Sequence, residues 1–367
     1  KQKIMSFAKI EKLPKDISSS LPFRGITPSG IMETYPGTFT KQYHLDDINF
    51  QMAPLDEQVT IFGNFETLVN TFNENTRWQF TIFNHKVDKM ETLKQIQFIP
   101  QNDGLNHYRQ EMTGVLVDKL CEGNNSIAQD KYLTVSIKDE NLDHAAESLL
   151  RVDKQVASGV RKITGHEVRP MKPMERLELL YNIYNQDYDY RFPIVEEYKD
   201  KDNKKGTISL KDLEKQGISI RDVVGPPMFD YSPRDYFKLG QTYGRTLYLA
   251  HVPSSLTSDF IAEISDVQCN MLVSTTAESY NQEDAIRLVR NRIADLEGEK
   301  QQRARSYADA GYLGSNVSPE LQQAVDGANE MLKDITKRNQ KIVFMTMTIT
   351  LFTETKELLD EFTKNVT

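Results

Sequence analysis

One pattern near the end of the chain constrains its fold more than any other: a strand between two helices. From Ile342 to Phe352, apolar residues alternate with threonines, so apolar side chains point to one face and hydroxyls to the other. Such alternation is typical of a half-buried strand, and Thr and Ile favour strands. Asn329–Arg338 before it and Glu354–Phe362 after it carry apolar residues at helical spacing. The stretch 327–362 is therefore predicted to fold as helix, strand, helix.

A second copy of this pattern lies about 210 residues earlier. Tyr108–Leu120 is predicted as a helix, Tyr132–Ile137 as a strand, and Asn141–Ile163 as a long amphipathic helix. The passages from strand to helix align, with Leu133–Ile137 matching Met347–Leu351. These matches predict that the chain contains two related units.

The elements before each copy follow the same order, which extends the repeat. The first unit is predicted to contain, in order, strands at 26–35 and 38–44, a helix at 54–72, a strand at 77–85, and then the copy described above. The second is predicted to contain a strand at 245–251, a helix at 254–264, a strand at 270–277 and a helix at 281–307 before its copy. The 54–72 helix is expected to turn one apolar face inward, formed by Val59, Phe62, Leu68, Val69 and Phe72.

Strands that return after helical crossovers predict an α/β (α+β) fold. We expect two tandem related α/β units, each a small mixed sheet covered by helices, joined by a partly helical connector. The expected boundaries are an N-terminal arm at 1–25, a first unit at 26–165, a connector at 166–235 and a second unit at 236–367.

Composition indicates an ordered globular chain long enough to bury more than one core. It has 367 residues, a net charge of −8, 27% charged and 38% hydrophobic residues. The acidic balance argues against a protein that mainly coats nucleic acid. Cys121 and Cys269 are too few for a disulfide framework and are interpreted as reduced core thiols. The sequence has no run of 18 apolar residues, so it predicts no transmembrane helix. Because the first residue is Lys1, we expect the chain to begin at a fragment boundary.

Searches for catalytic motifs find none in the sequence. There is no phosphate-binding Gly-x-x-x-x-Gly-Lys-Ser/Thr loop, no Cys-x-x-Cys pair and no Gly-x-Ser-x-Gly elbow. The six histidines are scattered without metal-ligand spacing. No catalytic, cofactor-binding or metal-binding residue is therefore predicted, although a site built from distant residues stays an alternative.

Three stretches resemble the CagE/TrbE/VirB-type conjugation ATPases of type IV secretion systems, above all those of Gram-positive conjugative elements. The first is GLNHYRQEM at 104–112, which continues through DKL at 118–120 and GNNSI at 123–127 to KYLTVSI at 131–137. The second is DYFKLGQTYGRTLYL at 235–249, and the third runs from Arg338 to Asp360. The resemblance spans most of residues 26–365.

This resemblance implies a specific role. In that family an N-terminal α/β region precedes a RecA-like motor that binds ATP and Mg²⁺. The present sequence resembles the N-terminal region alone, so the family's catalytic residues have no counterparts here, and we expect no ATP hydrolysis by this chain itself. The family's N-terminal region docks the motor at the inner face of the cell membrane, which implies a cytoplasmic, peripheral location. Its implied partners are membrane subunits of the secretion channel, the coupling ATPase and further copies of the full-length protein, all serving DNA transfer from plasmids and similar elements.

Some residues are candidate partner contacts on sequence grounds. They are Phe7 and Ile10 in the arm, Arg161 and Lys162 in the basic stretch 151–176, and Tyr188, Tyr190 and Phe192 in an aromatic alternation of the connector. Burial in a core competes with this interpretation for the aromatic and apolar residues, and a solvated helix face competes for the basic ones. For the basic stretch, anionic lipid or nucleic acid is a further alternative.

A second function is a nucleic-acid-binding protein built on ferredoxin-like units. In that case Trp78 and Phe80, alternating on one face of the 77–85 strand, would stack on bases. The nucleic-acid hypothesis predicts that this face of the 77–85 strand is open and basic. A face covered by the other unit would count against it.

Overall fold

The computed structural model describes residues 20–48, 50–86, 98–122, 127–186, 219–250, 260–309, 318–337 and 340–367; for 118–122 and 307–309 it describes the backbone alone. Ten strands of this part form one sheet, and every neighbouring pair is antiparallel. The sheet order is β1-β2-β3-β5-β4-β9-β10-β8-β7-β6. Their bounds are β1 Gly25–Ile26, β2 Met32–Glu33, β3 Thr38–Leu45, β4 Thr76–Lys86, β5 Ile127–Lys138, β6 Phe229–Asp230, β7 Phe237–Leu239, β8 Thr242–Tyr248, β9 Asn270–Ser279 and β10 Val343–Thr353.

The order of the strands is mirrored about the pairing of β4 with β9. Outward from this seam lie β5, β3, β2 and β1 on one side, and β10, β8, β7 and β6 on the other. The two aligned strands of the sequence repeat, in β5 and β10, therefore occupy matching places, each next to a seam strand. At the seam Arg77 pairs with Glu278 and Asn84 with Met271.

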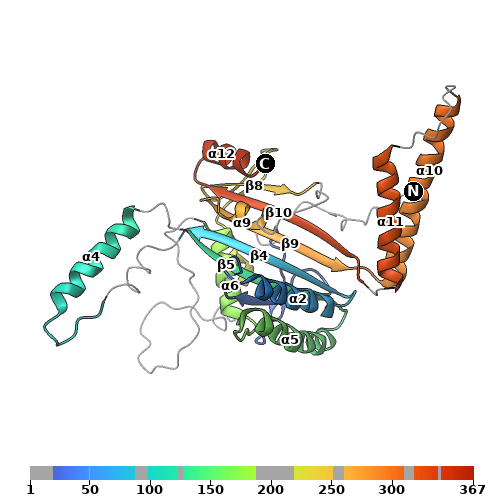
Figure 1. Ribbon diagram of the computed structural model, residues 1–367. Coiled ribbons are helices and arrows are strands. Elements are labelled where there is room, and N and C mark those ends of the chain that lie inside the picture. Colours follow the sequence, from blue (N-terminus) through green and yellow to red (C-terminus); the bar gives the residue numbers. More distant parts are fainter. Residues whose placement is uncertain are drawn as a thin grey trace.

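The predicted α/β class is confirmed, but the expected sheets differ from the observed one. Two small mixed sheets were expected, whereas the two sets of strands join edge to edge into a single antiparallel sheet (Figure 1). The physical reason is that each unit would otherwise expose an unpaired strand, β4 or β9, and pairing the two removes both edges. Sequence periodicity does not report which edges meet.

Four helices cover one face of the sheet. They are α2 Leu55–Thr71 and α5 Leu142–Thr164 over the first set of strands, and α9 Phe260–Ser265 and α12 Lys356–Val366 over the second (Figure 1). The long helix α5 buries one face, as its spacing predicts, and this face consists of Ala145, Leu149, Val152, Val156 and Val160. Asn141 caps its start by accepting from the backbone N–H of Asp143, and Gly165 ends it with φ +76°.

The connector supplies the helix that covers part of the other face. Helix α6, Pro173–Tyr184, places Leu179 against Phe83 and Tyr132 of the sheet. The short helix α8, Ile220–Val224, packs beside α6, and together they hold Leu21 and Phe23 at the start of the described chain. The two described helices of the connector are thus packed into the folded body.

Three helices project beyond the sheet. Helix α4, Asn106–Glu122, lies between β4 and β5 in the chain, while α10, Gln282–Asp309, and α11, Pro319–Lys337, lie between β9 and β10. Figure 1 shows α4 standing away from one end of the sheet and the α10–α11 pair rising from the opposite end. The two insertions therefore occupy the same place in the two units, but one is a single helix and the other a helical pair.

Candidate docking surfaces

Helix α2 exposes a row of apolar side chains that the sequence predicts to be inside. Leu55, Val59 and Phe62 are 74%, 65% and 63% exposed, and Met52 just before the helix is also exposed. Their spacing of four and three residues places Leu55, Val59 and Phe62 on one side of the helix. We call Met52, Leu55, Val59 and Phe62 the α2 patch. The predicted inward orientation of Val59 and Phe62 is wrong.

The opposite side and the C-terminal end of α2 fix this orientation. Leu68 and Phe72 are buried, and the Leu68 side chain packs against Gly159 of α5. The Asn64 side chain donates to the backbone oxygen of Lys162 at 3.1 Å. Because the helix is held through Asn64, Leu68 and Phe72, the row that begins at Leu55 is turned away from the core. Large apolar side chains gathered on a surface are typical of an interaction site.

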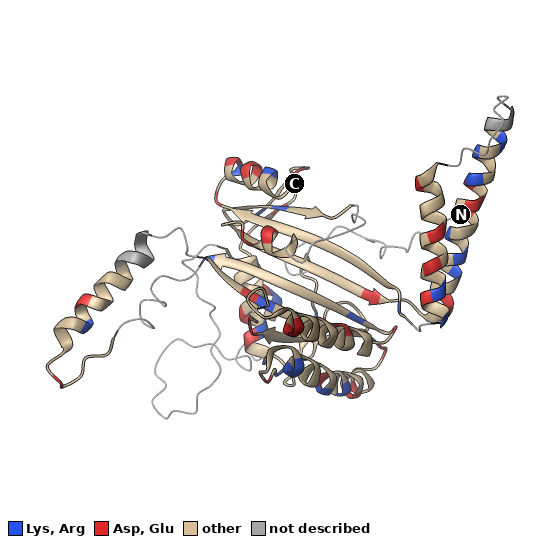
Figure 2. Ribbon diagram, viewed as in Figure 1, with Lys and Arg blue, Asp and Glu red and all other residues tan. Residues whose placement is uncertain are grey.

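Helix α4 carries a second apolar row, which no described part of the chain covers. Leu105, Tyr108, Met112 and Val115 are exposed, at the alternating spacing of three and four residues that is typical of a coiled-coil seam. We call these four residues the α4 stripe. No described side chain of α4, over 106–117, is buried. Over 106–117, Figure 2 shows few charged residues.

The start of α4 is fixed by local hydrogen bonds and an ion pair. The Arg109 guanidinium pairs with Asp103, and this contact, with the backbone N–H of Leu105, holds the pKa of the Asp103 carboxyl below its usual range. Asn106 and Gln101 exchange hydrogen bonds of 2.8 and 2.9 Å. Most of the stability of a helix in a protein comes from the packing of its apolar face rather than from helix propensity. Within the described part of the chain, the start of α4 is thus held in place, but no residue buries the side chains of 106–117.

In the second unit, the projecting helices α10 and α11 bury their apolar faces against each other. Val289 and Leu296 of α10 are buried against α11, through Ile335 at the base and Leu321 and Val325 further along. The outer surfaces carry charges of both signs (Figure 2). Helical spacing predicts that Leu288 faces inward with Val289 and Leu296, but Leu288 is exposed. Within the described chain, α4 has no such companion helix.

Trp78 and Phe80 do not form an open stacking platform. Trp78 is 6% exposed and lies against Phe72 at a ring-centroid distance of 6.1 Å, and Phe80 packs against Phe65 at 5.7 Å. Both point toward α2. On the other face of the same strand, Arg77 pairs with Glu278 and Phe83 is covered by α6. That strand therefore presents no basic aromatic surface.

Much of the basic stretch 151–176 has a structural role. Arg176 is buried and donates to the backbone oxygens of Gly30 and Thr40 at 2.8 Å and to the Thr40 hydroxyl at 2.9 Å. Burial lowers the pKa of Arg176 to about 10. Arg169 pairs with Glu175 at 2.7 Å. Arg161, a candidate contact, pairs with Glu167 at 3.3 Å on the surface.

Lys162, the other basic candidate, lies in the last turn of α5 and is exposed. A cation there is favourable for the helix dipole. Its backbone oxygen receives the α2 side chain of Asn64, so Lys162 lies beside α2. The remaining candidates, Phe7, Ile10, Tyr188, Tyr190 and Phe192, lie outside the described residues.

One acid on the sheet binds two histidines. Asp130 of β5 lies 3.0 Å from His85 Nε2 of β4 and 3.4 Å from His44 Nε2 of β3. Burial disfavours the charged His85 ring, but its hydrogen bonds to Asp130 and to the backbone oxygen of Lys86 outweigh this, and its pKa is raised. The same contact lowers the pKa of Asp130. The cluster ties three strands together at one end.

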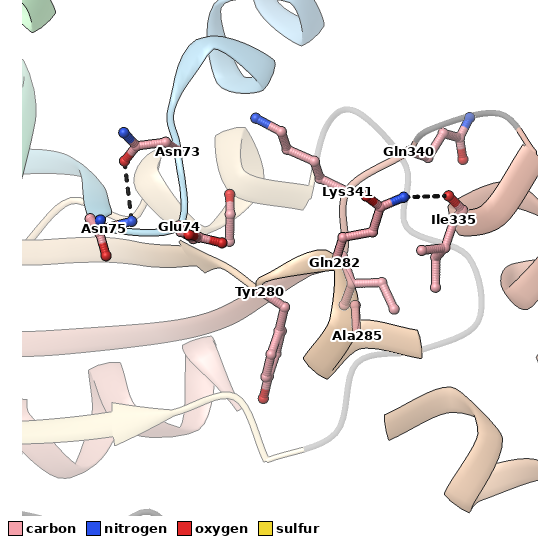
Figure 3. A pocket seen from close by; sticks show the side chains of 11 residues that line it. Asn73, Glu74, Asn75, Tyr280, Gln282, Ala285, Ile335, Gln340 and Lys341 are labelled. Carbon is pink, nitrogen blue, oxygen red and sulfur yellow. Dashed lines mark hydrogen bonds between the residues drawn. The ribbon is translucent and has the colours of Figure 1, made fainter. Parts of the chain in front are cut away.

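A cleft of about 260 Å³ lies where the α2–β4 turn meets the base of the α10–α11 pair (Figure 3). Its lining is mostly polar, with Asn73, Glu74 and Gln282 among the labelled side chains. Lys341 crosses between the units, donating to the backbone oxygens of Asn70 and Phe72 at 2.7 and 2.9 Å. The last turn of α2 is thereby connected to the strand β10 of the second unit.

Among the described residues, no group of three or more His, Cys, Asp or Glu side chains could hold a metal ion. In the same part of the chain, no helix is long and apolar enough to cross a bilayer. Cys269 is buried, and burial raises the pKa of its thiol to about 12, which disfavours the nucleophilic thiolate.

Comparison with known proteins found no matching family model and no similar curated protein.

The α2 patch was missed because the whole helix is rich in apolar residues. Leu55, Val59 and Phe62 form one row, while Phe65 and Leu68 contact the sheet and α5. A helix with more apolar residues than one buried face requires is a signal of a second contact surface. That excess is visible in the sequence, although the choice of the buried row is not.

Proposed function

We propose that this chain is the docking and assembly region of a type IV secretion ATPase of the conjugation class. It would hold an ATP-hydrolysing motor at the membrane channel through protein–protein contacts. The ATP and Mg²⁺ site would belong to the motor, which in the family follows the region that this chain resembles. The partners would be membrane subunits of the channel, the coupling ATPase and further copies of the full-length protein.

The observation that carries this proposal is the α4 stripe. The first of the resembling stretches, 104–137, includes α4 and β5. A helix that stands off the body with an unpartnered apolar seam is suited to receive another helix, because a few well-packed apolar anchors supply most of the binding energy of an interface. The mirrored sheet would provide a rigid base from which α4 and the α10–α11 pair reach partners at opposite ends.

Docking can be tested with two matched substitutions on α4. Met112→Asp introduces a charge into the stripe, whereas Gln110→Asp introduces the same charge on the exposed opposite side of the helix. Both would be made in the chain extended by its motor and incubated with membrane vesicles that contain the channel subunits. We expect Met112→Asp to lower the recruited fraction about tenfold, equivalent to about 1.4 kcal/mol, and Gln110→Asp to leave it unchanged.

ATP turnover tests the motor part of the proposal. Turnover is expected in the extended protein and absent in residues 1–367 alone, and Met112→Asp should not change it in solution. Equal recruitment of both variants would remove the role of α4. An extended protein without turnover would overturn its assignment to the ATPases.

A further inference from the structure

The α2 patch has an acidic border as well as an apolar centre. Helix α2 contains Asp56, Glu57 and Glu66 and has no Lys or Arg from Leu55 to Thr71, so its formal charge is −3. Glu66 continues the row of the patch, four residues beyond Phe62. Lys162 of the neighbouring helix α5 lies on the other side of α2, where its backbone oxygen accepts from Asn64. The ligand that fits this surface is therefore apolar and positively charged.

This charge distribution separates two kinds of occupant. An anionic bilayer would accept the apolar side chains but would be repelled by the three carboxylates of α2. A basic segment of polypeptide would be attracted by them and would bury its own apolar side chains against the patch. The charges thus favour a basic peptide over a lipid surface.

Residues 1–19, which lie outside the described part, have this chemistry. They contain five lysines against Glu11 and Asp16, a formal charge of +3. Ile4, Phe7, Ile10 and Leu13 recur at every third position. We propose that residues 1–19 of this chain dock on the α2 patch, with Phe7 and Ile10 among the apolar anchors and the lysines facing the carboxylates of α2. This inference does not depend on the proposed secretion function.

The described chain holds the other end of this segment in place. Leu21 and Phe23 are buried against Leu177 of α6 and Val224 of α8, so the segment leaves the body at a fixed point. Nineteen extended residues span up to about 60 Å, a length comparable with the dimensions of a domain of this size. Tethering would raise the local concentration of the segment at the patch.

A purified system tests the proposal without any secretion component. A fluorescent peptide of residues 1–19 would be titrated with the chain that begins at Ser20, and binding followed by anisotropy. We expect saturable binding that weakens with added salt. Val59→Asp in the protein should weaken it about tenfold or more, and so should Phe7→Ser with Ile10→Ser in the peptide. The full-length chain, with its own segment in place, should bind the peptide more weakly than the truncated chain.

Matched controls separate the patch from other apolar surfaces. Met112→Asp adds the same charge to the α4 stripe and should leave peptide binding unchanged. Since Val59 is mostly exposed, Val59→Asp should unfold at the same urea concentration as the parent. Equal peptide binding by Val59→Asp and its parent would overturn the proposal, as would no binding by the truncated chain. Binding of the peptide to anionic vesicles but not to the truncated chain would indicate that the segment binds membranes, and would also overturn the proposal.

Discussion

Gly159→Ala should destabilise this protein although Gly159 lies in the middle of a helix. In an unpacked helix, alanine is favoured over glycine by about 1 kcal/mol. Here a Cβ on Gly159 would lie 2.6 Å from Leu68 Cδ1 and 3.2 Å from both Leu68 Cβ and Cγ. Optimal carbon contacts are about 3.5–4.0 Å, and Leu68 is 2% exposed, so its side chain cannot relieve the contact by moving into solvent.

The two effects have opposite signs, and the steric one should prevail. Overpacking of a core costs about 1–3 kcal/mol, which exceeds the gain in helix preference and predicts a net loss of about 1 kcal/mol. Urea unfolding curves of the two proteins would measure it. Gly63→Ala in α2 is the matched control, because nothing lies within 4 Å of a Cβ there, and it should stabilise by up to about 1 kcal/mol.

A double-mutant cycle identifies the cause. In a Leu68→Ala background, which itself costs about 2–5 kcal/mol, Gly159→Ala should become neutral or stabilising, since the Cδ1 and Cγ atoms that it meets are gone. The coupling energy between the two positions should then be about 1–2 kcal/mol. An equal effect of Gly159→Ala in both backgrounds, or a stabilisation like that of Gly63→Ala, would refute the reasoning.

Three further outcomes are expected. Because the pKa of His85 is raised in the folded state, its contribution to stability should be complete below the unfolded-state pKa near 6.5 and be lost as pH rises through the folded-state pKa. His85→Gln should remove that part of the pH dependence of unfolding. An NMR titration of His85 with an unshifted pKa would contradict this prediction. Asp153→Ala should lower the free energy of unfolding by about 3–5 kcal/mol, because it leaves the ammonium of Lys41, whose side chain is 8% exposed, without its partner. A loss below about 1 kcal/mol in denaturant unfolding would contradict this and show that water reaches Lys41 in the variant. Trp78, the single tryptophan, should be poorly quenched by acrylamide and unaffected by single-stranded DNA, because it faces the core; quenching by DNA would revive the nucleic-acid alternative.

The local elements and the order in which they repeat can be predicted from the order of the residues alone. The alternation in β10 and the spacing along α5 are properties of neighbouring residues, and the buried row from Ala145 to Val160 follows from them. Matching strand-to-helix passages also predicted the matching places of β5 and β10. The resembling stretch at 104–137 contains α4, but none of the contact residues predicted from the sequence lies in that helix.

Which surfaces are covered depends instead on contacts between distant parts of the chain. The joining of β4 to β9 depends on contacts between residues about 200 positions apart, which periodicity does not encode. Likewise α2 has apolar residues on more than one side, and the packing of Leu68 against Gly159 turned Val59 and Phe62 outward. A helix rich in apolar residues specifies that something must cover it, but whether the sheet or another chain does so depends on the space that its neighbours leave.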